Sequence, residues 1–287
     1  MWHRSTFQLL RFHFSFFLLP VFLFAIGQLP QVNRVNAFFV FILLHLLVYP
    51  SSNGYNSYMD RDETPIGGLA SPLQPTKQLF YVSLLMDVIA VVLSLFIHYV
   101  LALGILFYIL ASRAYSYRGI RLKRFPIIGF LTVFCFQGAV IFFVTYYACT
   151  VSSPVHVPLL PCITSSLLIG ALYPLTQIYQ HEEDKKDGVI TISYLLGKRG
   201  TFIFSMLLFV VAAVCMYFIF REENRLNLFY LFLLCTLPVV LFFCKWMFQV
   251  WRNEKAADFK NSFRMNIIAT ICTTVFFTIL ILIKHVE

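Results

Sequence analysis

Long apolar segments alternate with short polar connections along almost the whole chain. A helix needs about 20 predominantly apolar residues to cross a bilayer, and nine segments come close to that length. They cover residues 8–29, 36–52, 78–97, 99–114, 126–148, 157–177, 200–220, 227–250 and 266–284. The pattern predicts an all-α integral membrane protein with nine transmembrane helices, forming one polytopic domain over residues 1–287.

The composition agrees with this prediction. Of the 287 residues, 60% are hydrophobic and 12% are charged, whereas soluble domains have roughly 45–50% and 25%. The net charge of +9 does not indicate a nucleic-acid partner, because the basic residues collect in particular connections between spans. The seven cysteines lie in or beside apolar segments without a C-x-x-C spacing, so we expect packed thiols rather than disulfides or metal ligands.

Basic residues also predict the orientation in the membrane. If the N-terminus is inside, 18 of the 22 Lys and Arg residues fall on the inner side. The other four are Arg34, Arg221, Arg225 and Lys284. The positive-inside rule then predicts an inner N-terminus and an outer C-terminus, with membrane lipids as direct partners.

An acidic motif at residues 53–68, NGYNSYMDRDETPIGG, follows the second apolar segment. On a helix, Asn53, Asn56 and Asp60 are spaced at i, i+3 and i+7 and share one face. Glu63 would continue that face one turn further on. Carboxylates gathered in this way repel one another unless a cation lies between them, and oxygen ligands of this kind suit Mg²⁺. The alternative is a solvated acidic loop between two spans.

A second acidic motif at residues 173–188, YPLTQIYQHEEDKKDG, repeats the arrangement after the sixth apolar segment. On a helix, Gln177, Asp184 and Asp187 share a face with Gln180 or the adjacent histidine. Both motifs fall on the predicted inner side.

The two motifs occupy corresponding places in the chain. Asp60 and Asp184 are 124 residues apart, and two further spans follow each motif before the next inner loop. This spacing predicts two four-helix pseudo-repeats followed by a final helix. Repeats of this kind commonly place a binding site at their interface.

A basic loop at residues 112–126, SRAYSYRGIRLKRFP, lies between the two motifs. It could simply anchor the protein on anionic lipid. It could also cap the acidic site and hold a diphosphate, because the planar arginine fork binds phosphate oxygens in pairs. Asp87, inside the third span, is costly in lipid and is either functional or a buried structural group.

Together these segments resemble the UbiA superfamily of intramembrane prenyltransferases. The family's first motif, N-x-x-x-D-x-x-x-D, is matched by Asn56 and Asp60, with Thr64 at its third position, where Glu63 or Asp62 could substitute. Its second motif, D-I-E-x-D-x-x-x-G-K-x-T-L-A-x-x-x-G, is followed from residue 181 to residue 197, with Gln180 at the first aspartate. The loop YSYRGIRLKRFP is similar to the family's Y-S-x-x-x-x-R-L-K-R-x-P element, and the resemblance covers essentially the whole chain.

The resemblance implies a Mg²⁺-dependent enzyme that transfers a prenyl group from a prenyl diphosphate to a lipophilic, aromatic acceptor. We expect it in a bacterial inner membrane. The catalytic residues would be Asn56, Asp60 and Asp184. The metal ligands would be Asn56, Asp60, Glu63, Asp184 and Asp187. The substrate-binding residues would be Asn53, Lys77, Tyr117, Arg118, Arg121, Lys123, Gln177, Gln180 and Glu183.

Two positions depart from the family pattern. Relatives commonly read N-R-P-L after the first motif, where this chain has Ser71 in place of the arginine and Lys77 as the nearest basic residue. Gln180 removes a charge from the second motif. These departures leave a non-catalytic prenyl-lipid binding protein as an alternative, and acids at broken spans leave a membrane transporter as another. The acceptor could be a quinone-ring acid, a porphyrin, a glycerolipid or a sugar phosphate.

Overall fold

The computed structural model describes residues 3–152 and 155–286. Regular structure within these residues is entirely helical, and nine helical segments are long and apolar enough to cross a membrane. They are Arg4–Gln28, Arg34–Asp60, Lys77–Ile97, Tyr99–Ser116, Pro126–Cys149, Leu159–Gln177, Ile192–Glu222, Leu226–Arg252 and Phe259–Lys284. The predicted number and order of spans are confirmed.

Two segments begin seven or eight residues earlier than the apolar pattern predicts. The seventh starts at Ile192, but Gly197 has a positive φ of 67° and separates a short first piece from the long helix beyond it. The ninth starts at Phe259, where a polar first turn precedes the apolar residues. In both cases the helix extends past the stretch whose side chains are apolar, so hydropathy alone misses its beginning.

Three of the spans change helix type along their length. The first consists of α1 (Arg4–Leu9), η1 (Phe12–Leu18) and α2 (Leu19–Gln28). The second consists of α3 (Arg34–Ile42), the π-helical η2 (Leu43–Val48) and α4 (Tyr49–Asp60). The fifth consists of α7 (Pro126–Val133), the π-helical η4 (Phe134–Val140) and α8 (Ile141–Cys149). Such interruptions re-aim side chains within a helix and are frequent at functional sites.

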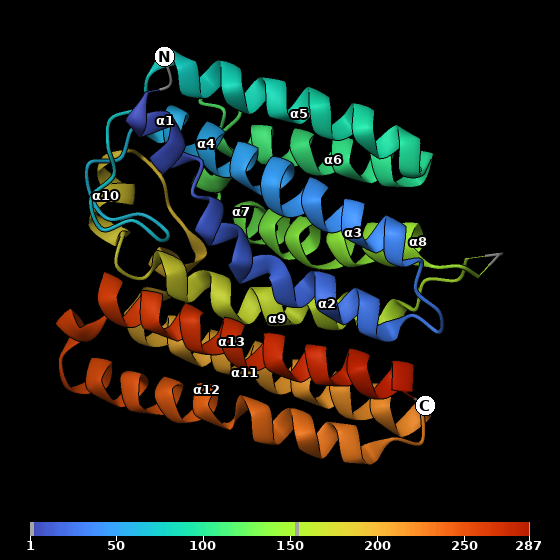
Figure 1. Ribbon diagram of the computed structural model, residues 1–287. Coiled ribbons are helices and arrows are strands. Elements are labelled where there is room, and N and C mark those ends of the chain that lie inside the picture. The colour runs from blue at the N-terminus through green and yellow to red at the C-terminus, as the bar shows by residue number, and fades with distance from the viewer. Residues whose placement is uncertain (1–2, 153–154, 287) are drawn as a thin grey trace.

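The remaining helices complete one bundle with its two ends well separated (Figure 1). They are α5 (Lys77–Ile97), α6 (Tyr99–Ser116), α9 (Leu159–Gln177), α10 (His181–Lys186), α11 (Ile192–Glu222), α12 (Leu226–Arg252) and α13 (Phe259–Val286). The short helix α10 and the loops around it lie at the end of the bundle that carries the N-terminus, and the C-terminus lies at the opposite end. An odd number of spans requires this separation.

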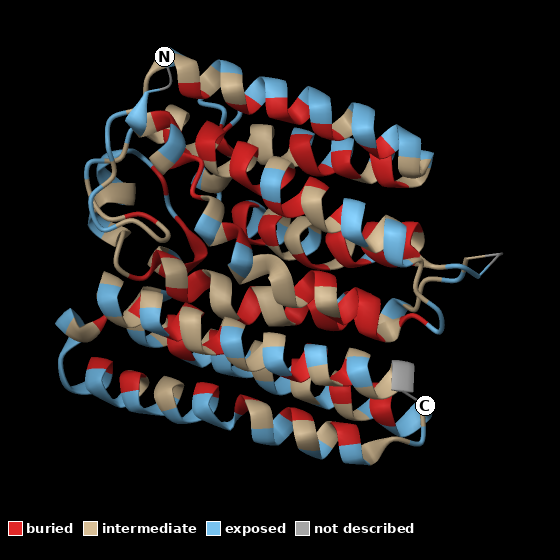
Figure 2. Cartoon of the chain, in the orientation of Figure 1, coloured by how far each residue is buried: buried red, intermediate tan, exposed pale blue. Residues whose placement is uncertain are grey.

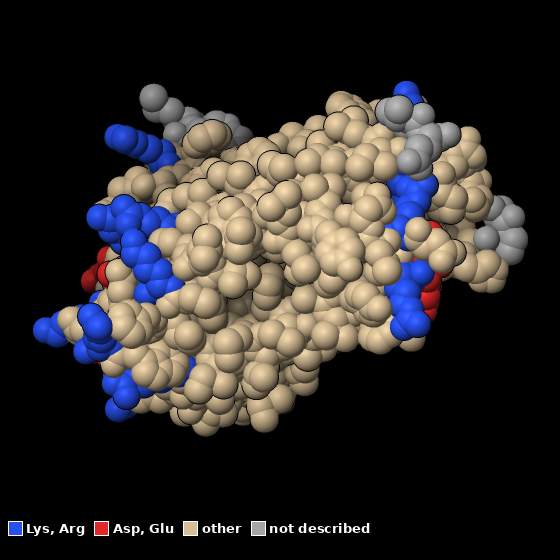
Figure 3. All heavy atoms as spheres, turned by 90° about the horizontal axis from the view of Figure 1, so that it is seen from below, with Lys and Arg blue, Asp and Glu red and all other residues tan. Residues whose placement is uncertain are grey.

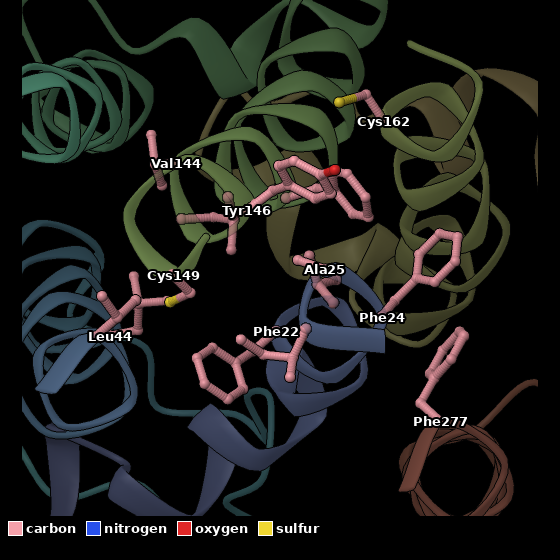
Figure 4. Packing of buried hydrophobic residues seen from close by; sticks show 14 of the residues in the cluster. Phe22, Phe24, Ala25, Leu44, Val144, Tyr146, Cys149, Cys162 and Phe277 are labelled. Atoms are coloured by element: carbon pink, nitrogen blue, oxygen red, sulfur yellow. The ribbon is translucent and has the colours of Figure 1, made fainter. Parts of the chain in front are cut away.

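The first span lies in the middle of the bundle and is held there by aromatic packing. The ring of Phe24 in α2 stacks on Phe277 of α13 at 4.8 Å and meets Phe142 of α8 edge-on at 5.2 Å. Figure 4 shows Phe24 and Phe277 facing each other, with Ala25 turned toward the neighbouring helix. Because lipid is as apolar as a leucine side chain, this close packing, rather than exclusion from water, holds the helices together.

The outer surface is suited to lipid. Figure 2 shows exposed positions along the outer sides of helices such as α5 and α12, and many of them are large apolar residues, including Phe96, Tyr230 and Leu241. Figure 3 shows a broad uncharged belt between two ends where Lys and Arg gather. This distribution is that of an integral, multi-pass membrane protein.

The predicted orientation can be tested with reporter fusions. A reporter that is active only in the cytoplasm should work when fused after Arg124, Arg199 or Lys260, and should be silent after Arg34 or Arg225. These positions alternate between the two ends of the bundle. The reverse pattern would place both acidic motifs outside the cell and remove the basis for the site described below.

Candidate active site

A cavity of about 200 Å³ lies at the end of the bundle where the two acidic motifs meet. Its wall is formed by parts of the first, second, fourth, fifth and sixth spans and by the connections that follow the second, fourth and sixth. Seven of the residues predicted from the sequence line it: Asn53, Asn56, Asp60, Lys123, Gln177, Gln180 and Asp184. Two chain segments more than 100 residues apart are thus joined in one site.

The first motif is helical only as far as Asp60. As predicted, α4 presents Asn56 and Asp60 on one face, and the Asn56 amide donates hydrogen bonds to Asp60 Oδ2 at 2.9 Å and Ser116 Oγ at 3.0 Å. Arg61 then adopts a left-handed conformation with φ 56° and ends the helix. The prediction that Glu63 continues this face is therefore wrong. Glu63 is exposed outside the cavity.

Asp62 takes the place that was predicted for Glu63. The left-handed turn brings its carboxyl group to the cavity wall. After Asp60 the sequence offers two further acids, Asp62 and Glu63, and helical spacing favoured Glu63, although the helix ends at Asp60 before it reaches either of them.

The second motif is also not one continuous helix. The sixth span α9 ends at Gln177, and α10 begins at His181. Gln177 and Asp184 nevertheless both line the cavity, while Asp187 ends α10 outside it. Gln180 lies at the break and donates a hydrogen bond of 3.3 Å to the Pro65 carbonyl. The second motif is therefore not one helix with a single polar face, as predicted, but the end of α9 followed by the separate short helix α10.

The basic loop connects the two acidic motifs. Arg121 bonds the Asp187 carboxylate, donates to the Asp187 carbonyl at 3.0 Å and lies 3.8 Å from Asp60 Oδ1. Lys123 Nζ is 2.5 Å from Asp60 Oδ2. Both basic side chains are almost completely buried, whereas Arg118 is half-exposed and 3.6 Å from Asp187. The loop therefore covers the acidic site rather than serving only as a lipid anchor.

Several predicted substrate-binding residues lie outside the cavity. Lys77 is exposed at the start of α5, and Tyr117 is exposed after α6. Glu183 pairs with Lys186 at 3.4 Å on the outer side of α10. Ser71, where relatives carry an arginine, is exposed, and its carbonyl accepts a hydrogen bond from the Gln8 amide.

Arg11 is a cationic residue of the site that the pattern of basic residues placed only on the inner side of the membrane. It has φ 47° at the break between α1 and η1, and it is 5% exposed. Its guanidinium donates to the carbonyls of Gly67 at 3.1 Å and Asn53 at 3.3 Å and lines the cavity. Its one signal in the sequence is an arginine inside an otherwise apolar segment. Arg11 supplies the cavity with a cation that Ser71 cannot.

The loop after α4 packs tightly over this arginine. A side chain at Gly67 would meet the Phe14 ring at 2.7 Å, and Gly68 has a φ of 84° that favours glycine. The Gly68 carbonyl is 3.1 Å from His13 Nε2. The loop is thus held against the first span on the side where it forms the cavity wall.

Burial changes the acidity of the cavity acids. It raises the pKa of Asp62 to about 6 and that of Asp184 to about 7 from an ordinary 3.8. Neighbouring carboxylates, Asp60 among them, contribute to these higher pKa values, while Lys123 acts in the opposite direction. Asp60 Oδ1 is buried without a hydrogen-bond partner among the described residues. Acids in this state gain most from a cation that neutralises them.

These residues fit Mg²⁺ bound together with a diphosphate. No three His, Cys, Asp or Glu side chains form a ready-made metal cage in residues 3–152 and 155–286. Mg²⁺ seldom uses such a cage, because it usually takes one or two carboxylates and fills the other positions with water and phosphate oxygens. Asp60, Asp62 and Asp184, with the amide oxygen of Asn56, provide the required hard oxygen ligands around one cavity.

Mg²⁺ binding should therefore depend on pH. The folded protein holds the protons of Asp62 and Asp184 more tightly than the unfolded chain, so their contribution to stability is greatest below about pH 4 and is lost as pH rises through about 6 to 7. Mg²⁺ requires the charged carboxylates, so its affinity should rise over the same range. We expect the Mg²⁺-induced increase in Tm to be small at about pH 5.5 and to grow up to about pH 7.5.

The matched control is the double variant Asp62→Asn with Asp184→Asn. It should lose both the Mg²⁺ effect and the fall in Tm with rising pH in EDTA. A Mg²⁺ effect that is equal at all pH values in the wild-type protein would contradict the assignment of these two acids.

Asp87 belongs to a different part of the molecule. Its carboxylate forms an ion pair with Arg113 of α6 and accepts a hydrogen bond of 2.6 Å from Ser51 Oγ. The Arg113 guanidinium also lies over the Tyr55 ring, 4.2 Å from its centroid. Asp87 does not line the cavity. Of the two predicted roles, the structure supports the buried structural group.

Comparisons with known proteins agree with this architecture. The model of the UbiA prenyltransferase family matches residues 16–268. A search of curated proteins found no match. A UbiA homologue from Archaeoglobus fulgidus bound to DMAPP and Mg²⁺ superposes with a TM-score of 0.71 at 16% identity, covering 96% of this chain and 99% of that one.

Two other solved structures are similar over the same extent. A UbiA homologue from Aeropyrum pernix K1 has a TM-score of 0.69 at 16% identity and covers 93% of this chain and 97% of its own. A structure described as digeranylgeranylglyceryl phosphate synthase has a TM-score of 0.61 at 17% identity and covers 97% of both chains. At these identities the superpositions establish the fold.

Proposed function

Since the chain belongs to the UbiA prenyltransferase family, we propose that it transfers a prenyl group from a prenyl diphosphate to a lipid-soluble aromatic acceptor, with Mg²⁺ as its metal. One observation carries the proposal: Asp60, Asp62 and Asp184 share a single cavity with Arg11 and Lys123. This combination of acids and bases suits a metal-bound diphosphate. The Archaeoglobus homologue, in structures bound to DMAPP or GPP, also contains Mg²⁺.

The residues of this chain would hold and orient the diphosphate. Arg11 of the first span and Lys123 of the basic loop both line the cavity and can each bind non-bridging phosphate oxygens. Arg121 fixes the position of the basic loop through Asp187, so that Lys123 need not reorganise during the reaction. Mg²⁺, when bound, supplies charge that stabilises the diphosphate as it leaves.

The reaction itself needs no nucleophile from the protein. The bond between prenyl C1 and the diphosphate oxygen breaks, and its electron pair leaves with the diphosphate. A new bond then forms between prenyl C1 and a carbon atom of the acceptor. The proton displaced from that carbon passes to the released diphosphate, which completes the balance.

The loop after α4 would protect this step from water. Gln180 binds the loop at Pro65, and Arg11 binds it at Gly67, on two sides of the cavity. Exclusion of water protects an allylic cation from hydrolysis and strengthens the charge interactions within the site. These contacts join the loop to both halves of the chain.

The structure weakens the grounds for the two alternatives. The transporter interpretation rested on acids at broken spans, which could bind a coupling ion. Such sites usually lie near the middle of the membrane, and Asp87, the acid inside a span, is already paired with Arg113. The interpretation as a non-catalytic binding protein relied on Ser71 and Gln180. Ser71 lies outside the cavity, and Arg11 supplies a cation inside it instead. Gln180 donates a hydrogen bond to the Pro65 carbonyl and so has a structural role.

Gln180→Asp is expected to lower activity, although it restores the family's usual residue. The change removes the amide donor to Pro65 and adds a carboxylate close to Asp184, which raises the pKa of that acid further. We expect kcat/KM to fall by about tenfold, the scale of one lost hydrogen bond, and the Mg²⁺ requirement to increase. Gln180→Asn is the matched control because it keeps a neutral amide. Higher activity in the aspartate variant would mean that Gln180 marks partial loss of function.

The proposed function is tested directly by diphosphate release. Purified protein is incubated with DMAPP, GPP and longer prenyl diphosphates, with Mg²⁺ or EDTA, and with a membrane extract as the source of acceptor. Mg²⁺-dependent release together with a prenylated lipid product is the expected result. Tight lipid binding without any release would identify a binding protein instead.

A further inference from the structure

A second cavity, of about 600 Å³, lies between α11 and α12, with parts of α9 and α13 behind it. It shares no lining residue with the active-site cavity. Its walls are almost entirely apolar, and Met206, Val210 and Val214 of α11 both line it and are exposed on the outer surface. Figure 1 shows α12 at the edge of the bundle. The cavity is therefore a groove, the α11–α12 groove, that opens sideways toward the lipid.

Aromatic contacts close both ends of this groove. Toward the active-site end, the ring of Phe202 in α11 lies 5.4 Å from that of Phe243 in α12. At the other end, the ring of Tyr217 lies 5.4 Å from that of Phe229. Between these contacts Pro238 interrupts α12, and a proline inside a helix removes a backbone hydrogen bond and bends the helix. The two helices thus meet at two points and leave a gap between them.

The groove is too narrow for another helix. Its lining residues in α11 run from Ser205 to Phe218, which is about 20 Å at 1.5 Å per residue. The volume spread over that length gives a mean cross-section of roughly 30 Å², whereas a helix about 10 Å across needs roughly 80 Å². Water is equally unsuited, because apolar walls offer it few hydrogen-bond partners. A single hydrocarbon chain suits both the width and the chemistry.

The rim of the groove leads to an arginine at the active-site end of the bundle. Arg199, Ile203 and Met206 follow one another at helical spacing, and all three are exposed. The Arg199 guanidinium donates a hydrogen bond of 3.2 Å to the Trp251 carbonyl at the end of α12, so it bridges the two helices that form the groove. Trp251 is itself exposed, and tryptophan is enriched where a membrane meets water.

This end of the groove attracts anions. Arg199 Nε is 3.6 Å from the Glu254 carboxylate, but both side chains are half-exposed. Lys198 also reaches this point, donating to the Glu254 carbonyl at 3.3 Å, and Arg252 follows Trp251 in the chain. Three cations against one acid favour a negatively charged head group, and an arginine can bind phosphate oxygens in pairs.

A polar atom lies where the esters of such a lipid would be. Ser205 Oγ is buried in the groove wall and has no hydrogen-bond partner among the described residues. It is about 9 Å along α11 from Arg199, on the way toward the middle of the membrane. Its hydroxyl can donate to an ester carbonyl of a lipid whose phosphate lies at Arg199.

The depth of the groove matches one leaflet. A bilayer with its head groups is about 40–45 Å thick, so one leaflet measures about 20–22 Å. Arg199 and Val214 are about 22 Å apart along α11, and the closing contact at Tyr217 comes just beyond. We propose that the α11–α12 groove binds one anionic phospholipid from the leaflet on the active-site side, with its phosphate at Arg199 and one acyl chain between the helices. This site goes beyond the proposed function and does not depend on it.

The head-group contact is tested by lipid titration. Delipidated protein in detergent is titrated with phosphatidylglycerol or phosphatidylcholine, and bound lipids are counted by native mass spectrometry. We expect one phosphatidylglycerol to bind with a Kd at least tenfold lower than that of phosphatidylcholine. Arg199→Ala should raise this Kd about tenfold, the scale of a lost hydrogen bond to a charged group. Lys245→Ala is the matched control, because this exposed cation is about 200° round α12 from Phe243 and faces away from the groove.

The acyl-chain contact is tested by filling the groove. Cys244 lines it and is exposed, whereas Cys135 is equally exposed on the fifth span outside it. Cys244→Trp should abolish the tight phosphatidylglycerol site, and Cys135→Trp should leave it intact. Val210→Phe, on the opposite rim, is a second filling variant. Phosphatidylglycerol should raise the Tm of the wild type and of Cys135→Trp but not that of the filled variants. The Tm without lipid shows whether each variant is folded.

Three results would overturn the proposal: equal affinity for the two phospholipids, an unchanged Kd in Arg199→Ala, or equal binding by the two tryptophan variants. A dimer that forms only when phosphatidylglycerol is absent would identify a second copy of the chain as the occupant instead. Prenyl transfer is not measured in these experiments, so failure of the proposed function would be a separate result.

Discussion

Asp60→Ala and Asp184→Ala are each expected to reduce prenyl transfer by roughly 10²–10³-fold or more, the scale on which a lost electrostatic contact slows an enzyme. Each change removes a carboxylate from the cavity that both acidic motifs line and that would hold the metal-bound diphosphate. Asp60→Asn should be almost as harmful, because it keeps the shape of the side chain and loses the charge. The measurement is the rate of Mg²⁺-dependent diphosphate release by purified protein.

Nearby acids provide graded controls for this prediction. Glu182 is exposed two residues before Asp184, so Glu182→Ala should leave the rate nearly unchanged. Asp187 lies outside the cavity but holds Arg121, so Asp187→Ala should give an intermediate loss. Tm and membrane insertion are measured for every variant, because Asp60→Ala also leaves Lys123 without its partner. Wild-type turnover in both alanine variants would show that the metal binds elsewhere or is not used.

Asp87→Ala is expected to have the largest effect on stability, about 3–5 kcal/mol, the usual cost of breaking one side of a buried ion pair. The side chains of Arg113 and Asp87 are only 14% and 9% exposed, and they lie within the bundle. Without Asp87 the buried guanidinium would retain its charge but lose its carboxylate partner, and would lie over the Tyr55 ring. The measurement is Tm or the midpoint of denaturant unfolding in lipid nanodiscs.

Two further variants show whether the pair itself is responsible. Ser51→Ala removes one hydrogen bond to the same carboxylate and should cost about 1 kcal/mol. A double variant, Asp87→Leu with Arg113→Met, removes both charges and should recover much of the lost stability. If Asp87→Ala folded normally and lost only activity, Asp87 would be a functional acid and its structural assignment would be wrong.

Most of the fold could be predicted from the sequence because it depends on lengths and periods. The thickness of the bilayer sets the length of each apolar segment, so nine such segments predict nine spans wherever the helices lie. The helical period likewise placed Asn56 and Asp60 on one face before any contact was known. Segment length and helical period both depend on residues close together in the chain, and the predictions made from them agree with the structure.

The site was less predictable wherever a local break redirected the chain. Arg61 adopts a left-handed conformation and ends α4, so that Asp62 rather than Glu63 lines the cavity. The chain also breaks at Gln180, where the sequence predicted one continuous helix through the second motif. Helical spacing assumes continuity, so it fails beyond the first residue that leaves the helix. Similarity to a family motif could mark these segments but could not say which acid faces the cavity.

The amino-acid sequence by itself determined the membrane class, the number of spans and the two acidic motifs with the basic loop between them. Only the tertiary structure decided which groups meet: Arg11 lines the cavity and Ser71 does not, and Arg113 pairs with Asp87 across two helices. The physical reason is the separation along the chain over which each effect acts. Hydrophobic length and helical period act between neighbours in the chain, whereas a buried charge is stabilised by whichever partner packing brings within a few ångströms, and that partner can come from any span.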